Sequence, residues 1–71
     1  MSASILVVDD EEAILTSLSS ILRDEGYEVA VAKNGVEALR AYTMDPPDLM
    51  LLDIWMPEMD GMETLRRVRE L

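Results

Sequence analysis

Aspartate residues directly follow two short apolar runs of the sequence. Asp9 and Asp10 come after residues 5–8, and Asp53 comes after residues 49–52. Carboxylates held close together repel one another, and a hard divalent cation such as Mg²⁺ relieves the repulsion because it prefers oxygen ligands. An aspartate beside such an ion can also act as a nucleophile and form an aspartyl phosphate. Aspartate is equally a common turn former and helix N-cap, so the spacing alone leaves both interpretations open.

The apolar runs themselves predict strands. Residues 5–8 and 49–52 are continuously apolar, which is typical of strands covered on both faces in a parallel sheet. Residues 27–32 alternate instead, with Tyr27, Val29 and Val31 separated by charged or small residues. This alternation favours a strand at the edge of the sheet, with one face less buried.

Helical patterns separate the three predicted strands. The first ends before Gly26, which can adopt the left-handed conformation that stops a helix. The second covers residues 36–43 and ends before two prolines that no helix can continue through. The third begins near Gly61 or Met62. The apolar residues at helical spacing are Ile14, Leu15, Leu18, Ile21 and Leu22, then Val36, Leu39 and Tyr42 facing inward, then Met62, Leu65 and Val68 facing inward.

The predicted order is therefore β-α-β-α-β-α, which indicates an α/β fold with parallel strands and right-handed crossovers. In such a sheet, ligands bind outside the carboxyl ends of the strands. Neighbouring strands lie about 4.8 Å apart, so Asp9 or Asp10 is expected close to Asp53 if their strands are neighbours.

Composition excludes several classes of function. The chain has 15 acidic and 6 basic residues and a net charge of -9, which argues against binding to nucleic acid or to an anionic membrane surface. It has no cysteine, so neither disulfides nor thiolate zinc sites form. No apolar run approaches the roughly 18 residues needed to span a bilayer, and no signal peptide is visible. We expect a cytoplasmic protein.

Two motifs carry a resemblance to a known family. Residues 5–12, ILVVDDEE, resemble the opening of response-regulator receiver domains, and residues 53–61, DIWMPEMDG, resemble their phosphorylation loop. Residues 26–29 and 32–39 are similar to the family's second strand and second helix. The resemblance covers residues 1–71 as a partial receiver domain, the first three βα units. It implies a flavodoxin-like doubly wound parallel sheet whose first three strands are ordered 2-1-3.

The resemblance also implies a role for individual residues. Asp53 corresponds to the phosphoacceptor, Asp10 to a direct Mg²⁺ ligand, and Asp9 to a residue that holds the metal mainly through water. The backbone carbonyl of Trp55 corresponds to a further metal ligand. The residues that shape the loop are Met56, Pro57 and Gly61.

A receiver is a signalling domain rather than an enzyme, and its phosphoryl donor is a phosphohistidine on a sensor histidine kinase. This chain contains no histidine, so the donor comes from outside. Residues 52–57 are similar to receivers of nitrogen-regulation-type transcription activators, which is a weaker resemblance because many outputs share receivers.

Part of the family pattern has no counterpart in these 71 residues. The family's switch Ser or Thr and its later lysine are absent, and the single lysine, Lys33, lies after the second strand. We therefore expect impaired switching. The strand that begins at Leu49 and ends at Asp53 is expected to be an open edge that pairs with its copy in a homodimer. The alternative function is a self-associating half-domain without phosphotransfer.

Two other classes also place chemistry at a strand end. A phosphohydrolase of the haloacid dehalogenase type uses an aspartate nucleophile, but it requires a second aspartate two residues on, where this chain has Trp55. A nucleotide-binding enzyme is disfavoured because the sequence has no glycine-rich phosphate loop.

Overall fold

The computed structural model describes residues 2–53 and 61–70, and the predicted order of elements is confirmed. None of the helices in these residues is long and apolar enough to cross a membrane. The elements are β1 (Ser4–Val8), α1 (Glu12–Asp24), β2 (Glu28–Ala32), α2 (Gly35–Met44), β3 (Leu49–Leu52) and α3 (Gly61–Arg69).

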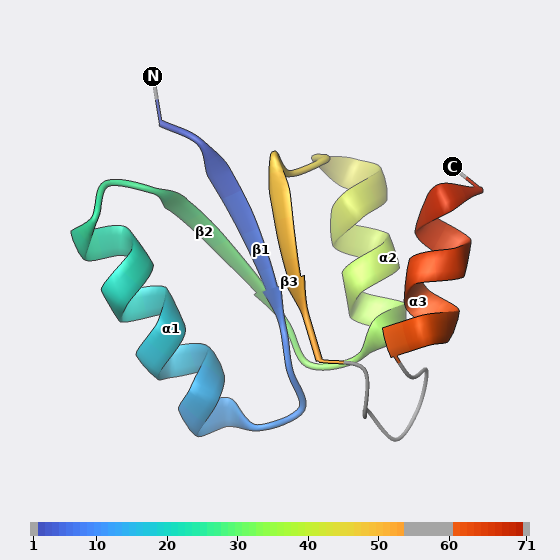
Figure 1. Ribbon diagram of the computed structural model, residues 1–71, viewed down its shortest axis with the longest axis horizontal. Helices are drawn as coiled ribbons and strands as arrows, with labels where there is room; N and C mark the ends of the chain where they lie inside the picture. Colours follow the sequence, from blue (N-terminus) through green and yellow to red (C-terminus); the bar gives the residue numbers. More distant parts are fainter. Residues whose placement is uncertain (1, 54–60, 71) are drawn as a thin grey trace.

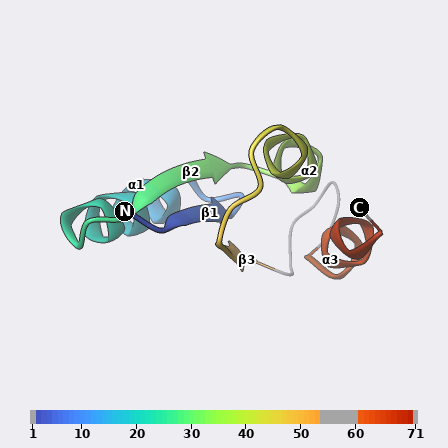
Figure 2. The same ribbon diagram turned by 90° about the horizontal axis from the view of Figure 1, so that it is seen from above.

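The three strands form one parallel sheet in the order β2-β1-β3, as the receiver resemblance implies. In the central strand, Val8 lies beside Ala32 on one side and Leu52 on the other. Helix α1 covers one face of the sheet, and α2 and α3 lie side by side toward the other (Figures 1 and 2). The fold is thus a flavodoxin-like α/β layering built on three strands.

Strand β1 is the core of the molecule, since residues 5–8 are all buried. Alternate side chains enter two separate apolar clusters because successive residues of a strand point to opposite faces. Ile5 and Val7 pack with Leu15 of α1. The cluster on the α2 side consists of Leu6, Val8, Ala32 and Ala38. The prediction that a continuous apolar run marks a doubly covered strand is confirmed for β1.

Helix α2 packs on the sheet with a face centred on Ala38, so one of its three predicted inward residues is exposed. Val36 was expected to face inward, but it is 44% exposed, whereas Ala38 is fully buried. Leu39 and Tyr42 are half-buried. The small side chain of Ala38 lets the helix backbone approach the sheet closely, and this phase turns Val36 toward solvent. In α1, similarly, Leu15 is buried while Ile14 and Ile21 are exposed.

Local signals define the helix ends. Gly26 has a φ of 94°, which confirms the predicted left-handed stop after α1. Asn34 caps α2, because its side-chain oxygen accepts a hydrogen bond from the Glu37 amide at 2.9 Å. The Glu37 carboxylate in turn accepts from the Lys33 amide at 3.1 Å, so the turn between β2 and α2 is fixed from both sides.

The starts of β1 and β3 are joined at the amino edge of the sheet. The Ser4 amide donates to a carboxylate oxygen of Asp48 at 2.7 Å, and the Asp48 amide donates to the Ser4 carbonyl at 2.9 Å. This contact fixes the register of the two strands, and the register decides which residues meet at their far ends. In the sequence, the only sign of this contact is an acidic residue after two prolines.

Candidate metal and phosphoryl site

Three aspartates converge at the carboxyl edge of the sheet. Their nearest carboxylate oxygens, from Asp9, Asp10 and Asp53, all lie within 4.8 Å of one another. The cause is the strand register, because Val8 and Leu52 are aligned and the next residues follow side by side. The Asp53 amide donates to the Val8 carbonyl at 3.0 Å, and the Asp9 amide donates to the Ala32 carbonyl at 3.1 Å. Strand pairing thus extends to the aspartates themselves.

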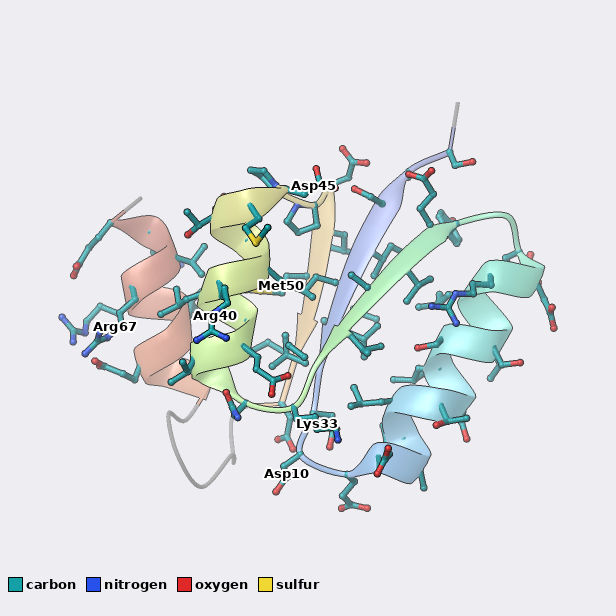
Figure 3. The ribbon with its side chains drawn as sticks, turned by 180° about the vertical axis from the view of Figure 1, so that it is seen from behind. Asp10, Lys33, Arg40, Asp45, Met50 and Arg67 are labelled. Atoms are coloured by element: carbon teal, nitrogen blue, oxygen red, sulfur yellow. The ribbon has the colours of Figure 1, made fainter. Side chains whose placement is uncertain are left out.

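The loop after β1 orients two of these carboxylates differently. One carboxylate oxygen of Asp9 accepts a hydrogen bond from the Glu11 amide at 2.9 Å, which holds the side chain against the start of α1. Asp9 and Asp53 are half-buried, whereas Asp10 is exposed. Figure 3 shows Asp10 at this edge, at the opposite end of the sheet from Asp45. The cluster therefore has a sheltered floor and one solvent-facing carboxylate.

The geometry of the cluster fits a small hard cation. Mg²⁺ binds oxygen at about 2.1 Å, so two oxygens on one ion lie at most about 4.2 Å apart. The observed limit of 4.8 Å is close to this span, and modest side-chain rotation closes the difference. Carboxylates are the ligands that Mg²⁺ prefers, and one or two of them usually suffice because the ion keeps several waters.

A hollow of about 510 Å³ lies directly beside the aspartates, and its walls are mostly apolar. It opens between α1 and β3, where Leu18 and Leu51 face it. An apolar wall lowers the local dielectric and strengthens electrostatic interactions at its border. The lining residues are Val7, Val8, Asp9, Leu18, Leu51, Leu52 and Asp53. Nothing in the sequence pattern singled out Leu18 as part of this site.

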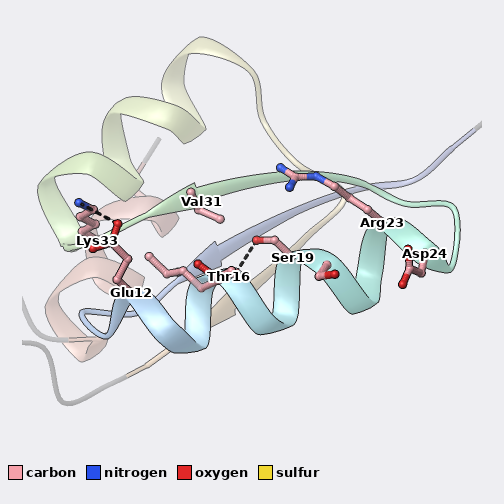
Figure 4. A pocket seen from close by; sticks show the side chains of 9 residues that line it. Glu12, Thr16, Ser19, Arg23, Asp24, Val31 and Lys33 are labelled. Carbon is pink, nitrogen blue, oxygen red and sulfur yellow. Dashed lines mark hydrogen bonds and ion pairs between the residues drawn. The ribbon is translucent and has the colours of Figure 1, made fainter.

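Lys33 lies near the cluster but is engaged elsewhere. Its ammonium is 3.9 Å from a carboxylate oxygen of Glu12, at one end of a groove of about 450 Å³ between α1 and β2 (Figure 4). Both side chains are largely exposed, so the ion pair contributes little to stability. The interpretation that Lys33 does not correspond to the family's later lysine stays a prediction.

Three of the predicted site residues, Trp55, Met56 and Pro57, lie outside the described residues. Their assigned roles, a metal-binding carbonyl and loop shaping, stay predictions. Gly61 is the first residue of α3, and its predicted role in the turn into that helix also stays a prediction.

Comparison with known proteins identifies the class of protein. Residues 5–71 match the response regulator receiver domain, and the chain belongs to this family. It is 44% identical over 70 residues to the alkaline phosphatase synthesis transcriptional regulatory protein PhoP of Bacillus subtilis, covering 99% of this chain and 29% of PhoP.

Solved receiver structures are similar in fold as well. The chemotaxis protein CheY4 of Vibrio cholerae superposes with a TM-score of 0.95 at 38% identity, covering 99% of this chain and 58% of CheY4. The response regulator TrrA of Thermotoga maritima, in complex with Mg²⁺-BeF, superposes with a TM-score of 0.90 at 44% identity. The match covers 99% of this chain and 60% of TrrA. The chain thus spans less than a third of PhoP and somewhat over half of the two receiver structures. The predicted nitrogen-regulation type stays a prediction.

Proposed function

We propose that this receiver accepts a phosphoryl group on Asp53, from a phosphohistidine of a sensor histidine kinase in the cytoplasm. The observation that supports this most is the convergence of three aspartate carboxylates at the carboxyl edge of the sheet. In the transfer, an Asp53 carboxylate oxygen forms the new bond to phosphorus while the bond from phosphorus to the donor's imidazole nitrogen breaks. The imidazole leaves with the bond's electron pair and afterwards takes up a proton.

We propose that Asp10 and Asp53 bind Mg²⁺ directly, that Asp9 holds it through water, and that the Trp55 carbonyl adds a ligand. The bound ion neutralises charge on the incoming phosphoryl group, which an anionic pocket otherwise repels. Asp9 suits the indirect role, because the Glu11 amide already occupies one of its oxygens. Asp10 suits the direct role, because its exposed side chain can turn toward an ion.

The test is phosphorylation by a small donor. The chain is incubated with Mg²⁺ and acetyl phosphate, and intact mass spectrometry measures the gain of one phosphoryl group. We expect the gain in the unaltered chain and in Asp24→Asn, a matched change at the exposed end of α1, and its loss in Asp53→Asn. Equal labelling of Asp53→Asn, or labelling that persists after Mg²⁺ is chelated, would contradict the proposal.

A second candidate function rests on β3. Leu49 and Leu51 are 52% and 37% exposed, and within the described residues β3 pairs with β1 alone. Unpaired strand edges with apolar side chains recruit further strands. We propose that this edge, ending at Asp53, pairs with its copy around a two-fold axis to give a homodimer with the strand order 2-1-3-3′-1′-2′. If the chain sedimented as a compact monomer throughout a micromolar dilution series, this second proposal would be contradicted.

A further inference from the structure

A second hollow lies at the opposite edge of the sheet from the aspartate cluster. It has a volume of about 600 Å³ and opens between the carboxyl end of α2 and the starts of β1 and β2. Figure 3 places Asp45 at this edge, far from Asp10 and Lys33. The residues that line it are Ser4, Ile5, Leu6, Glu28, Val29, Ala30, Ala41, Met44, Asp45 and Pro47. We name it the amino-edge groove.

Small side chains create the groove. Ala30 on β2 and Ala41 on α2 face the space between helix and sheet, and each offers only a methyl group. Met44 borders the groove and is 81% exposed, the most exposed of the large apolar residues in the described chain. Methionine is flexible and polarizable, so it adapts to varied apolar partners. The groove therefore has an apolar floor and an adaptable apolar border.

The ionisable side chains that line the groove itself are acidic. Glu28 and Asp45 are its ionisable lining residues, and both are acidic and exposed. The carboxyl end of α2 adds the negative end of the helix dipole, and its last turn contains no basic residue. Ser4 contributes little recognition of its own, because its amide and hydroxyl already contact Asp48.

These features select the chemistry of a partner. A purely apolar partner would remove Glu28 and Asp45 from water without pairing them, which is unfavourable. An acidic partner would be repelled by them and by the net charge of -9. We propose that the amino-edge groove docks an extended segment of a partner protein in which an apolar side chain is flanked by lysine or arginine. The apolar side chain enters between Ala30 and Ala41, and the basic groups meet the acidic border.

This site is independent of phosphoryl chemistry at Asp53, because it lies at the other end of the sheet. A basic apolar segment could therefore occupy it in both the phosphorylated and the unphosphorylated chain. Failure of docking here leaves the proposed function untouched, and the two are tested by different measurements.

The experiment titrates the ¹⁵N-labelled chain with a capped peptide of alternating lysine and leucine and follows amide chemical shifts. We expect saturable shifts centred on Leu6, Ala30, Ala41 and Met44. A lysine–serine peptide of equal charge controls for general attraction to an acidic protein, and a glutamate–leucine peptide controls for general apolar binding. Shifts centred on Asp9, Asp10 and Asp53, equal shifts with either control peptide, or no shifts would each overturn the proposal.

Matched variants separate the two parts of the recognition. The pair Glu28→Gln and Asp45→Asn is expected to weaken binding by about three- to tenfold, since each exposed ion pair contributes a small increment. The control pair Asp24→Asn and Glu25→Gln removes the same charge elsewhere and is expected to leave affinity within about twofold.

Ala30→Leu fills the groove and is expected to abolish binding, whereas Ala13→Leu on the exposed side of α1 is not. The spectrum of each variant reports its folding before titration. Unchanged affinity in a folded Ala30→Leu variant would overturn the proposal.

Discussion

The two edges of the sheet are built differently. Strand β2 exposes Glu28, and its outward Val29 carbonyl accepts a hydrogen bond from the Arg23 guanidinium at 3.1 Å. Strand β3 is four apolar residues long, and every second one is exposed. Charged side chains and occupied backbone groups are the usual protection of a strand edge. The β2 edge thus has the features of a true outer edge, whereas β3 has the composition of an interior strand.

The faces beside the two edges differ in the same way. On the α1 face, Ile5 and Val7 are covered by the helix, whereas their neighbours in register, Leu49 and Leu51, are largely exposed. Helix α1 also turns Ile14 and Ile21 to solvent. Apolar composition alone therefore does not decide burial in this sheet, because a strand is buried only where a helix packs over it. The exposed leucines of β3 thus form an apolar surface directly next to the hollow beside Asp53.

The largest expected change in stability concerns two leucines on neighbouring strands. Leu49 lies beside Ile5, the residue that precedes Leu6 in β1. Leu6→Ala in β1 removes a side chain that is 1% exposed and should lower the free energy of unfolding by about 2–5 kcal/mol. Leu49→Ala removes one that is 52% exposed and should lower it by less than about 1 kcal/mol. Urea unfolding followed by circular dichroism, at a concentration where the chain is monomeric, measures both. Equal losses would mean that β3 is covered in solution.

Self-association gives the next largest effect. Leu51→Lys places a charge on the open edge and should weaken any dimer by at least about tenfold, whereas Val31→Lys on the protected edge should leave the dimer unchanged. Val31 is a suitable match because it is 45% exposed and Leu51 is 37% exposed. Sedimentation across a dilution series measures the dissociation constant. If Val31→Lys weakened the dimer and Leu51→Lys did not, the interface would lie at β2 and not at β3.

The protection of β2 is itself testable. Arg23→Gln removes the charged donor to the Val29 carbonyl, and we expect a loss of about 0.5 kcal/mol because the bond is exposed to solvent. Arg40→Gln on the exposed surface of α2 is the matched control and should cost less. Chemical denaturation measures both variants. A larger loss in Arg40→Gln would show that the Arg23 contact does not protect this edge.

The order of elements, the parallel sheet and the meeting of the aspartates could all be predicted from the sequence. The reason is that the apolar runs of β1 and β3 mark the strands, and each of these two runs is followed directly by an aspartate. The phase of α2 could not be predicted, because Ala38 is weakly apolar and only its small size explains why that face approaches the sheet. The amino-edge groove was equally hidden, since it depends on the absence of side-chain volume at Ala30 and Ala41. Such features depend on how closely a helix packs on the sheet, which a local sequence pattern does not predict.

The charged side chains of α3 pair with one another along the helix surface. In α3, the Glu63 carboxylate accepts hydrogen bonds from the Arg66 guanidinium at 2.6 Å and from the Arg67 guanidinium at 2.9 Å. These contacts lower the pKa of Glu63 below its ordinary value of 4.5, with the Arg66 hydrogen bond as the largest cause. By contrast, α1 buries Leu15 against the sheet, and its anchoring does not depend on titration.

The smallest effect expected is therefore a pH dependence confined to α3. A carboxylate with a lowered pKa in the folded state stabilises the fold above its unfolded pKa, and that contribution is lost as pH falls through the folded value. At neutral pH, Glu63→Gln should reduce the helical amide shifts of Leu65 and Val68 slightly. The difference from the unaltered chain should vanish once the pH lies below the folded pKa, because protonated glutamate and glutamine are then alike in charge. A difference that persisted in acid would mean that Glu63 acts through packing and not through its charge. Helices α1 and α3 would then not differ in their dependence on pH.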